Sequence, residues 1–218
     1  MPAASSGYGG AGLCPAGAVA GQGREVEILL LGPQGSGKGT QAKRIAADFE
    51  IPHIATGDII RAMKEADSPL GRELKAVYNR GDLVPDELMI RLIEERLARD
   101  DAEDGFILDG FPRTMPQAEA LDDLLRDLGR ELDVVLEFQV PDRDTLRERV
   151  LKRAREESRS DDSPEALARR LALYYEQTEP LVEYYRSRHG NVVGIHADRS
   201  VDEVYREIQE SLDQVGAR

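Results

Sequence analysis

The segment that most constrains this chain of 218 residues is a glycine-rich turn that joins an apolar run to an amphipathic stretch. Val26–Leu31 is β-branched and aliphatic apart from Glu27, as a buried strand is, and residues 41–49 have helical spacing. The turn between them reads Gly32-Pro33-Gln34-Gly35-Ser36-Gly37-Lys38-Gly39-Thr40. A strand, a glycine turn and a helix start bring backbone N–H groups and a partial positive charge to one point, which suits a bound phosphate.

The turn fits the G-x-x-x-x-G-K pattern of phosphate-binding loops at Gly32, Gly37 and Lys38. The next position, normally Ser or Thr, holds Gly39, and the hydroxyl follows at Thr40. An ordinary glycine-rich turn is the alternative interpretation. The spacing directly after a strand favours a nucleotide-phosphate site, in which Lys38 supplies a mobile charge for the outer phosphates.

Composition restricts the partners of such a site. The net charge is −13, whereas nucleic-acid polymers need a basic face, so no nucleic-acid partner is expected. A polyanionic ligand on so acidic a chain requires a local cluster of positive charge. Cys14 is the single cysteine, so we expect no cysteine-rich zinc site and a reducing cytoplasm. No apolar run approaches the roughly 20 residues that span a bilayer, so no membrane partner is expected.

The order of segments predicts one α/β domain at 25–216. Residues 1–24 are rich in Gly, Ala, Ser and Pro, which predicts a disordered tail. Strand-like runs then alternate with helical patterns, which is typical of a parallel sheet with helices on both faces. Strands are expected at 26–31, 51–55, 106–109, 134–138 and 191–195. Helices are expected at 41–49, from Thr56, and at 69–78, 86–99, 116–128, 142–155, 164–188 and 200–212.

One polar residue ends the third predicted strand and another lies in the loop after it, at the sheet edge where ligands of parallel sheets bind. Asp109 is either a turn cap or the carboxylate that holds the hydration shell of a phosphate-bound Mg²⁺. Its position opposite the phosphate loop favours Mg²⁺. Arg113 lies in a loop that Phe111-Pro112 stiffens, so we expect it to contact a ligand rather than solvent alone.

Four arginines surround a charged segment late in the chain. Arg149 and Arg153 share one face of a predicted helix, Arg159 lies in the charged loop, and Arg170 lies on the next helix. For any one of them a solvated basic face is the better interpretation, and the chain has 24 Arg against 5 Lys. Together, at the mouth of a phosphate site, they would form a clamp of planar bidentate groups.

Other polar residues have ordinary structural interpretations. His53 is interpreted as a packed or capping histidine rather than a catalyst. Thr56 fits a helix N-cap as well as a ligand contact, and Gln117 fits an exposed first-turn residue as well as a ligand contact. The tyrosines at 174, 175, 184 and 185 are expected to pack.

Taken together, these stretches resemble the adenylate kinase family over about residues 26–212. The motifs that carry the resemblance are Gly32–Gln41, His53–Arg61, Gly81–Asp86, Gly105–Thr114 with Pro116–Ala118, and Arg159–Asp162 followed by Arg170-Leu171. Adenylate kinases have Thr at the place of Thr56, whereas the related uridylate/cytidylate kinases more often have Ala. The resemblance therefore favours AMP as the acceptor.

The resemblance implies a P-loop NTPase fold, in which a five-stranded parallel sheet flanked by helices carries an AMP-binding flap at 55–84 and a short lid at 152–163. It implies a cytoplasmic monomer that catalyses MgATP + AMP ⇌ 2 ADP, with Mg²⁺ and without zinc. The alternatives are a UMP/CMP kinase and a non-catalytic nucleotide-binding regulator.

The resemblance also assigns roles to individual residues. The ATP-binding set is Gly35, Ser36, Gly37, Lys38, Gly39, Thr40, Arg149, Arg153 and Arg199. The AMP-binding set is Thr56, Gly57, Arg61, Asp82, Leu83, Val84, Gly110, Arg113, Gln117, Arg159 and Arg170. The catalytic set is Lys38, Arg113, Arg149, Arg153, Arg159 and Arg170, and Asp109 would hold Mg²⁺ through water.

Overall fold

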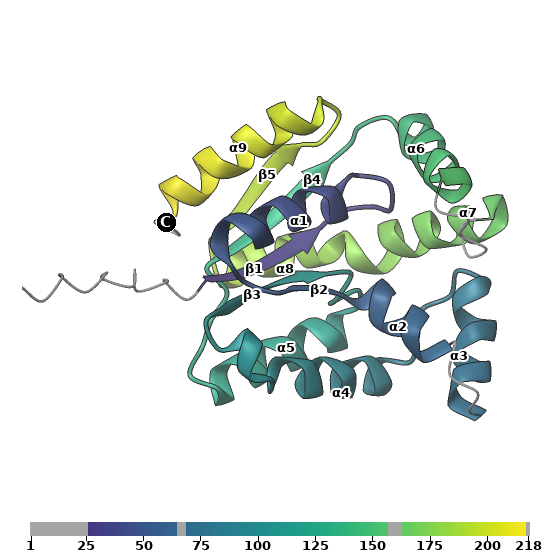
Figure 1. The fold of residues 1–218 in the computed structure, drawn as a ribbon, viewed down its shortest axis with the longest axis horizontal. Coiled ribbons are helices and arrows are strands. Elements are labelled where there is room, and N and C mark those ends of the chain that lie inside the picture. The colour runs from purple at the N-terminus through teal and green to yellow at the C-terminus, as the bar shows by residue number, and fades with distance from the viewer. Residues whose placement is uncertain (1–25, 65–68, 157–162, 217–218) are drawn as a thin grey trace, which may run out of the picture.

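A computed structural model of the chain describes residues 26–64, 69–156 and 163–216 (Figure 1). The predicted tail at 1–24 and most of the predicted lid, including Arg159, lie outside these ranges. The strands are β1 Val26–Leu31, β2 His53–Ala55, β3 Gly105–Asp109, β4 Val134–Gln139 and β5 Val192–His196. The helices are α1 Lys38–Phe49, α2 Thr56–Lys64, α3 Pro69–Asn79, α4 Asp86–Leu97, α5 Met115–Asp127, α6 Arg143–Glu156, α7 Pro164–Leu173, α8 Pro180–Arg188 and α9 Val201–Gln214.

The five strands form one parallel sheet in the order β2-β3-β1-β4-β5. This is the α/β architecture of the P-loop NTPase fold, and the prediction of a five-stranded parallel sheet is confirmed. Leu30 pairs with Asp109 of β3 and Leu31 with Glu137 of β4, so β1, β3 and β4 end close together. The glycine turn after β1 and the loop after β3 therefore lie side by side at the carboxyl edge of the sheet.

Alternate residues of the central strand face two separate cores. Leu29 and Leu31 pack with α4, α5 and α8, whereas Ile28 and Leu30 pack with α1, α9 and the start of α6. Figure 1 shows the same layers, with α4 and α5 on one side of the sheet and α1 and α9 on the other. A strand buried on both faces is expected to be largely apolar, and β1 is aliphatic at every position except Glu27, which is buried as well.

The single helix predicted at 164–188 is wrong, because the structure divides this stretch into three segments. A π-helical turn, Tyr174–Thr178, separates α7 from α8. Pro180 has no N–H to donate to the carbonyl four residues earlier, so regular α-helical bonding cannot pass through it. Instead the backbone N–H of Glu179 donates to the carbonyl of Tyr174 at 2.8 Å, five residues back.

The second strand is shorter than predicted and begins at His53 rather than at residue 51. Pro52 lacks a donor, and its carbonyl alone joins the sheet by accepting from Ile107 N at 2.9 Å. Across 26–64, 69–156 and 163–216, no helix has the length and apolar character needed to cross a bilayer.

Candidate active site

The phosphate loop wraps around the N-terminus of α1. Gly35 has φ 87°, and a Cβ there would lie 2.7 Å from the carbonyl oxygen of Leu146, so only glycine fits without strain. Gly37, with φ 94°, is the residue before α1, and a Cβ on it would meet nothing within 4 Å. The loop thus leaves open space beside the residue that precedes α1, and the N-terminus of a helix is a place where a phosphate group would be stabilised.

The Lys38 ammonium lies inside this loop. Its Nζ donates to the carbonyl of Gly32 at 2.6 Å and to the carbonyl of Pro33 at 2.9 Å. Burial lowers the pKa of Lys38 to about 8, and the charges of Arg113 and Arg153 lower it too, against the opposing charge of Asp109. An anion bound in front of the loop would reverse this shift, because it would stabilise the charged ammonium.

A cleft of about 900 Å³ opens in front of the loop, large enough for a bound ligand of nucleotide size. Its lining combines the loop, the ends of β1 and β3, and residues from α2, α6, α7 and α9. The cationic side chains of this lining are Lys38, Lys43, Arg61, Arg113, Arg149, Lys152, Arg153, Arg170 and Arg199, against Asp58 and Asp109. A chain of net charge −13 therefore holds a local excess of positive charge at this cleft.

Asp109 ends β3 and faces the phosphate loop. The Nε2 atom of His53 lies 3.3 Å from its Oδ2. Burial raises the pKa of Asp109, but the hydrogen bond with His53 and the charges of Lys38 and Arg113 outweigh it and hold that pKa below its usual value. Asp109 is therefore a carboxylate at neutral pH. His53 packs, as predicted, but no local sequence feature indicates that its partner is this carboxylate.

Arg113 follows Asp109 and is held from three sides. Its Nε donates to the carbonyl of Gly110 at 2.7 Å, and its own carbonyl accepts from Thr178 Oγ1 at 2.8 Å. Its backbone N–H donates to Gln117 Oε1 at 2.8 Å. Burial lowers the pKa of Arg113, since the guanidinium is largely removed from water. The Thr178 hydroxyl of the π-helical turn thus helps to fix the backbone of Arg113, a contact that the sequence does not predict.

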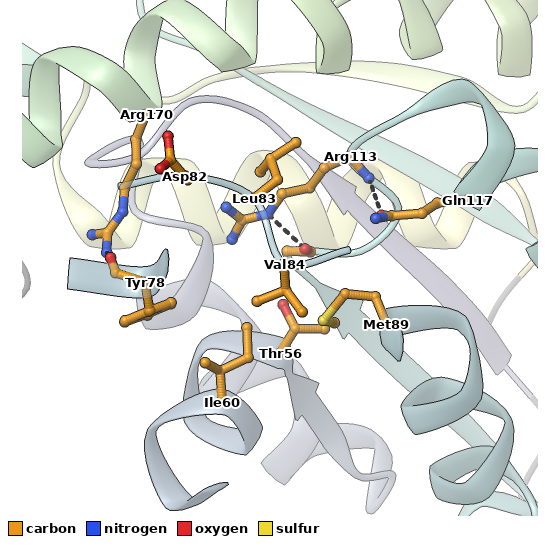
Figure 2. A pocket seen from close by; sticks show the side chains of 11 residues that line it. Thr56, Ile60, Tyr78, Asp82, Leu83, Val84, Met89, Arg113, Gln117 and Arg170 are labelled. Carbon is orange, nitrogen blue, oxygen red and sulfur yellow. Dashed lines mark hydrogen bonds between the residues drawn. The ribbon is translucent and has the colours of Figure 1, made fainter. Parts of the chain in front are cut away.

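A narrow side pocket opens from the cleft beneath the loop after α3 (Figure 2). Its cavity volume is about 20 Å³, roughly room for one water molecule. The walls are largely apolar, with Ile60, Val84 and Met89, and the polar residues of its lining include Gln117. Gln117 is only 1% exposed, so its interpretation as an exposed first-turn residue is wrong.

Tyr78 joins two of the cationic residues to the end of α3. Arg61 NH1 donates to the Tyr78 hydroxyl at 2.9 Å, and Arg170 NH2 donates to the Tyr78 carbonyl at 3.0 Å. On the other side of the cleft, Arg149 NH1 donates to the Ala197 carbonyl at 2.8 Å. The Thr56 hydroxyl donates to the Asp109 carbonyl at 3.2 Å and ties α2 to β3. Tyr78 was not among the predicted site residues.

The structure brings together the predicted site residues that it describes. The cleft is lined by Gly35, Ser36, Gly37, Lys38, Gly39, Thr40, Gly57, Arg61, Asp109, Arg149, Arg153 and Arg199. The side pocket is lined by Thr56, Asp82, Val84 and Gln117, and both are lined by Leu83, Gly110, Arg113 and Arg170. Which ligand each residue binds stays a prediction.

The donor set at the cleft fits Mg²⁺ that arrives with a nucleotide. Mg²⁺ prefers oxygen ligands and usually keeps several waters when it binds through one carboxylate and phosphates. Asp109 provides an ionised carboxylate there, and the Thr40 hydroxyl also lines the cleft. Within the described ranges, His, Cys, Asp and Glu form no cluster of three or more that could hold a metal ion by protein ligands alone.

Comparison with known proteins agrees with this geometry. A family model described as adenylate kinase matches residues 30–190. The adenylate kinase of Cyanothece sp. is 45% identical over 188 residues, 86% of this chain and 95% of that protein. Those of Xanthomonas campestris pv. campestris and Thermobifida fusca are 46% identical over 187 residues, 86% of this chain and 99% and 98% of those proteins. The chain belongs to the adenylate kinase family.

Proposed function

We propose that this protein catalyses reversible phosphoryl transfer from MgATP to AMP, giving two molecules of ADP. The observation that carries the proposal is that one cleft joins a phosphate loop to a separate, largely apolar pocket, and that Arg113 and Arg170 line both. A phosphate loop alone would indicate one nucleotide. A second pocket that shares its cations with the cleft supports a second nucleotide, whose phosphate would meet the first between these arginines.

The residues of the cleft suit charge stabilisation rather than acid–base chemistry. Phosphoryl transfer requires positioned reactants and neutralisation of the charge on the transferring group. Lys38 and Arg113 would neutralise that charge from the sheet edge, with Arg149, Arg153, Arg159 and Arg170 from the lid side. Asp109 would hold Mg²⁺ through water, and the bound ion would supply charge neutralisation to the phosphate groups. No nucleophile of the chain is required, because the AMP phosphate attacks in line.

ATP would bind with its phosphates on Gly35–Thr40 and its base near Arg199. The side pocket would hold the AMP base, with Thr56, Gly57 and Arg61 on the α2 side and Asp82–Val84 above it. Because this pocket has a volume of only about 20 Å³, a base cannot enter without movement of its walls. This supports a mobile flap at 55–84, and we propose a lid at 152–163 that closes with it and excludes water. That the protein is a monomer of the cytoplasm stays a prediction.

A panel of nucleoside monophosphates with MgATP tests the proposal. ADP formation should be fastest by kcat/KM with AMP, because the pocket combines apolar walls with one amide. A faster reaction with UMP or CMP would replace the proposal by a pyrimidine monophosphate kinase. Binding of ATP without formation of ADP from any acceptor would instead indicate a nucleotide-binding regulator.

A further inference from the structure

The side-chain amide of Gln117 lies between two groups, and each of these groups can form a hydrogen bond with only one end of the amide. Its Nε2 donates to Asp86 Oδ1 at 2.6 Å, and its Oε1 accepts from the backbone N–H of Arg113 at 2.8 Å. Asp86 begins α4 and Gln117 lies in the first turn of α5, so the contact joins two helices. Figure 2 shows Gln117 beside Arg113 at the wall of the side pocket.

These contacts fix which way the amide points. A carboxylate oxygen only accepts hydrogen bonds, and a backbone N–H only donates them. Rotating the amide by 180° would place its oxygen against the Asp86 carboxylate and its NH₂ against the Arg113 N–H. Both contacts would then be repulsive, and a buried polar group without a partner costs more than the net value of its hydrogen bond. Gln117 is only 1% exposed, so water could not replace the two lost hydrogen bonds.

Asp86 has no hydrogen bond that would explain it as a helix cap. Pro85 is the residue that precedes α4, and no side chain caps that end. Glu87, the other acidic residue of the first turn, is exposed and offers the same favourable charge at the helix N-terminus. The feature that separates Asp86 from Glu87 is the bond from Asp86 to Gln117.

The amide has two N–H donors and two carbonyl lone pairs, and the protein uses one of each. One N–H donor and one carbonyl lone pair of the amide remain available to a ligand. The contacts with Asp86 and Arg113 fix which of the two lies on which side. The edge of adenine offers the complementary order, since N1 accepts and the 6-amino group donates. A 6-oxopurine reverses it, because its N1 carries hydrogen and its C6 oxygen accepts.

We propose that Asp86 is a positioning residue that locks the Gln117 amide in the orientation that reads a 6-aminopurine and rejects a 6-oxopurine. The proposal rests on the proposed function, since it takes the side pocket as the site of the acceptor base. Asp86 acts through Gln117 and touches neither substrate.

The test compares AMP with IMP, whose base differs from adenine by the change at C6 and the hydrogen on N1. In Asp86→Asn, the contact at position 86 permits both orientations of the Gln117 amide, because an Asn side chain both donates and accepts hydrogen bonds. We expect the ratio of kcat/KM for AMP over IMP to fall about tenfold, mainly through a higher KM for AMP, while the KM for MgATP is unchanged. Glu87→Gln, the matched control, should keep the wild-type ratio. Asp86→Ser serves in place of Asp86→Asn if the latter does not fold.

A double-mutant cycle separates positioning from general support of the helix pair. Gln117→Met removes the amide and keeps the side-chain length, so Asp86→Asn in that background should leave the AMP/IMP ratio unchanged. An equal fall in both backgrounds, or no fall in the Gln117-containing protein, overturns the role of Asp86. A wild-type enzyme that uses IMP as well as AMP also overturns the role of Asp86, whereas one that uses UMP or CMP faster than AMP, or forms no ADP, contradicts the proposed function. The two failures are therefore distinguishable.

Discussion

Charged side chains are buried at both ends of the parallel strands, which we call the carboxyl edge and the amino edge of the sheet. The two edges differ in what neutralises those charges. At the carboxyl edge, Lys38, Asp109 and Arg113 line a cleft of about 900 Å³. At the amino edge, Arg130 Nε lies 2.6 Å from Glu27 Oε1, with side chains only 13% and 6% exposed. At the first edge burial and the charges of Arg113 and Arg153 lower the pKa of Lys38, whereas at the second edge Glu27 and Arg130 form an ion pair.

At the amino edge the chain itself pairs the opposite charges, although the buried NH2 group of Arg130 makes no hydrogen bond within the described ranges. Arg130 NH1 also donates to the carbonyl of Ala102 at 2.8 Å, and the Glu27 backbone N–H donates to Asp133 Oδ2 at 2.8 Å. These bonds connect the start of β1 to the segments before β3 and β4. The carboxyl edge has an excess of positive charge, which a bound anionic ligand would neutralise. The comparison therefore predicts that mutations at the carboxyl edge impair activity and that mutations at the amino edge impair stability.

Replacement of Lys38 should have the largest effect. Lys38→Met removes a charge that would stabilise the transferring phosphoryl group, and removal of one such donor typically costs 10²–10³ in rate. We expect kcat for ADP formation to fall by about 10³, which is about 4 kcal/mol. Thermal unfolding should occur no lower than in the wild type, because the variant loses a buried cation. Activity close to that of the wild type would show that the site is misplaced.

Replacement of Arg130 should have the opposite profile. Arg130→Met leaves Glu27 buried without its partner, and such breaks typically cost 3–5 kcal/mol. Urea unfolding at pH 8 should show a loss of about 3 kcal/mol, with kcat of the folded enzyme unchanged. Arg126→Met, which removes an arginine with a 63% exposed side chain, is the matched control and should stay within about 0.5 kcal/mol. A lower kcat with unchanged stability would contradict the comparison.

This loss should depend on pH, since burial raises the pKa of Glu27 to about 7 although Arg130 opposes the shift. Native Glu27 thus holds its proton more tightly than the unfolded chain does. Its contribution to stability is fully present below about pH 4.5 and is lost as the pH rises through about 7. At pH 5.5 the carboxyl of Arg130→Met is protonated, so the variant should lose less stability there than at pH 8.

The sheet and the phosphate loop could be predicted because their signals are local. The aliphatic run of β1 and the glycines of the turn each fix the structure within a few residues. The prediction of one helix at 164–188 was wrong, although Pro180 indicates an interruption of the helix. No local feature of the sequence marks the π-helical turn that precedes Pro180.

Partners that are distant in sequence could not be predicted from local pattern. Asp86 and Gln117 are 31 residues apart, His53 and Asp109 are 56 apart, and Thr178 and Arg113 are 65 apart. Each pair depends on the packing of elements that the sheet order brings together. The family motifs predict Gln117 and Arg113 as site residues, whereas the residues that hold them follow only from the three-dimensional contacts.

The smallest predicted effect concerns proton uptake at the carboxyl edge. Since Lys38 has a pKa of about 8 in the free protein, it is mostly charged at pH 7 and mostly neutral at pH 9. Triphosphate oxygens favour the charged form, so ATP binding should take up protons above about pH 8, where the phosphates, whose last pKa is about 6, are fully ionised. The affinity should then fall by at most about tenfold, or about 1.4 kcal/mol, for each unit of rising pH.

Calorimetry in two buffers of different ionisation enthalpy measures this uptake directly. We expect the number of protons taken up on ATP binding to be near zero at pH 7 and to approach one at pH 9. The Lys38→Met variant should show no uptake at either pH, because it has no ammonium to charge. Uptake that persists in this variant would assign the proton to another cation of the cleft. Lys38 would then already be fully charged in the protein without ATP, and its charge would not depend on a bound anion.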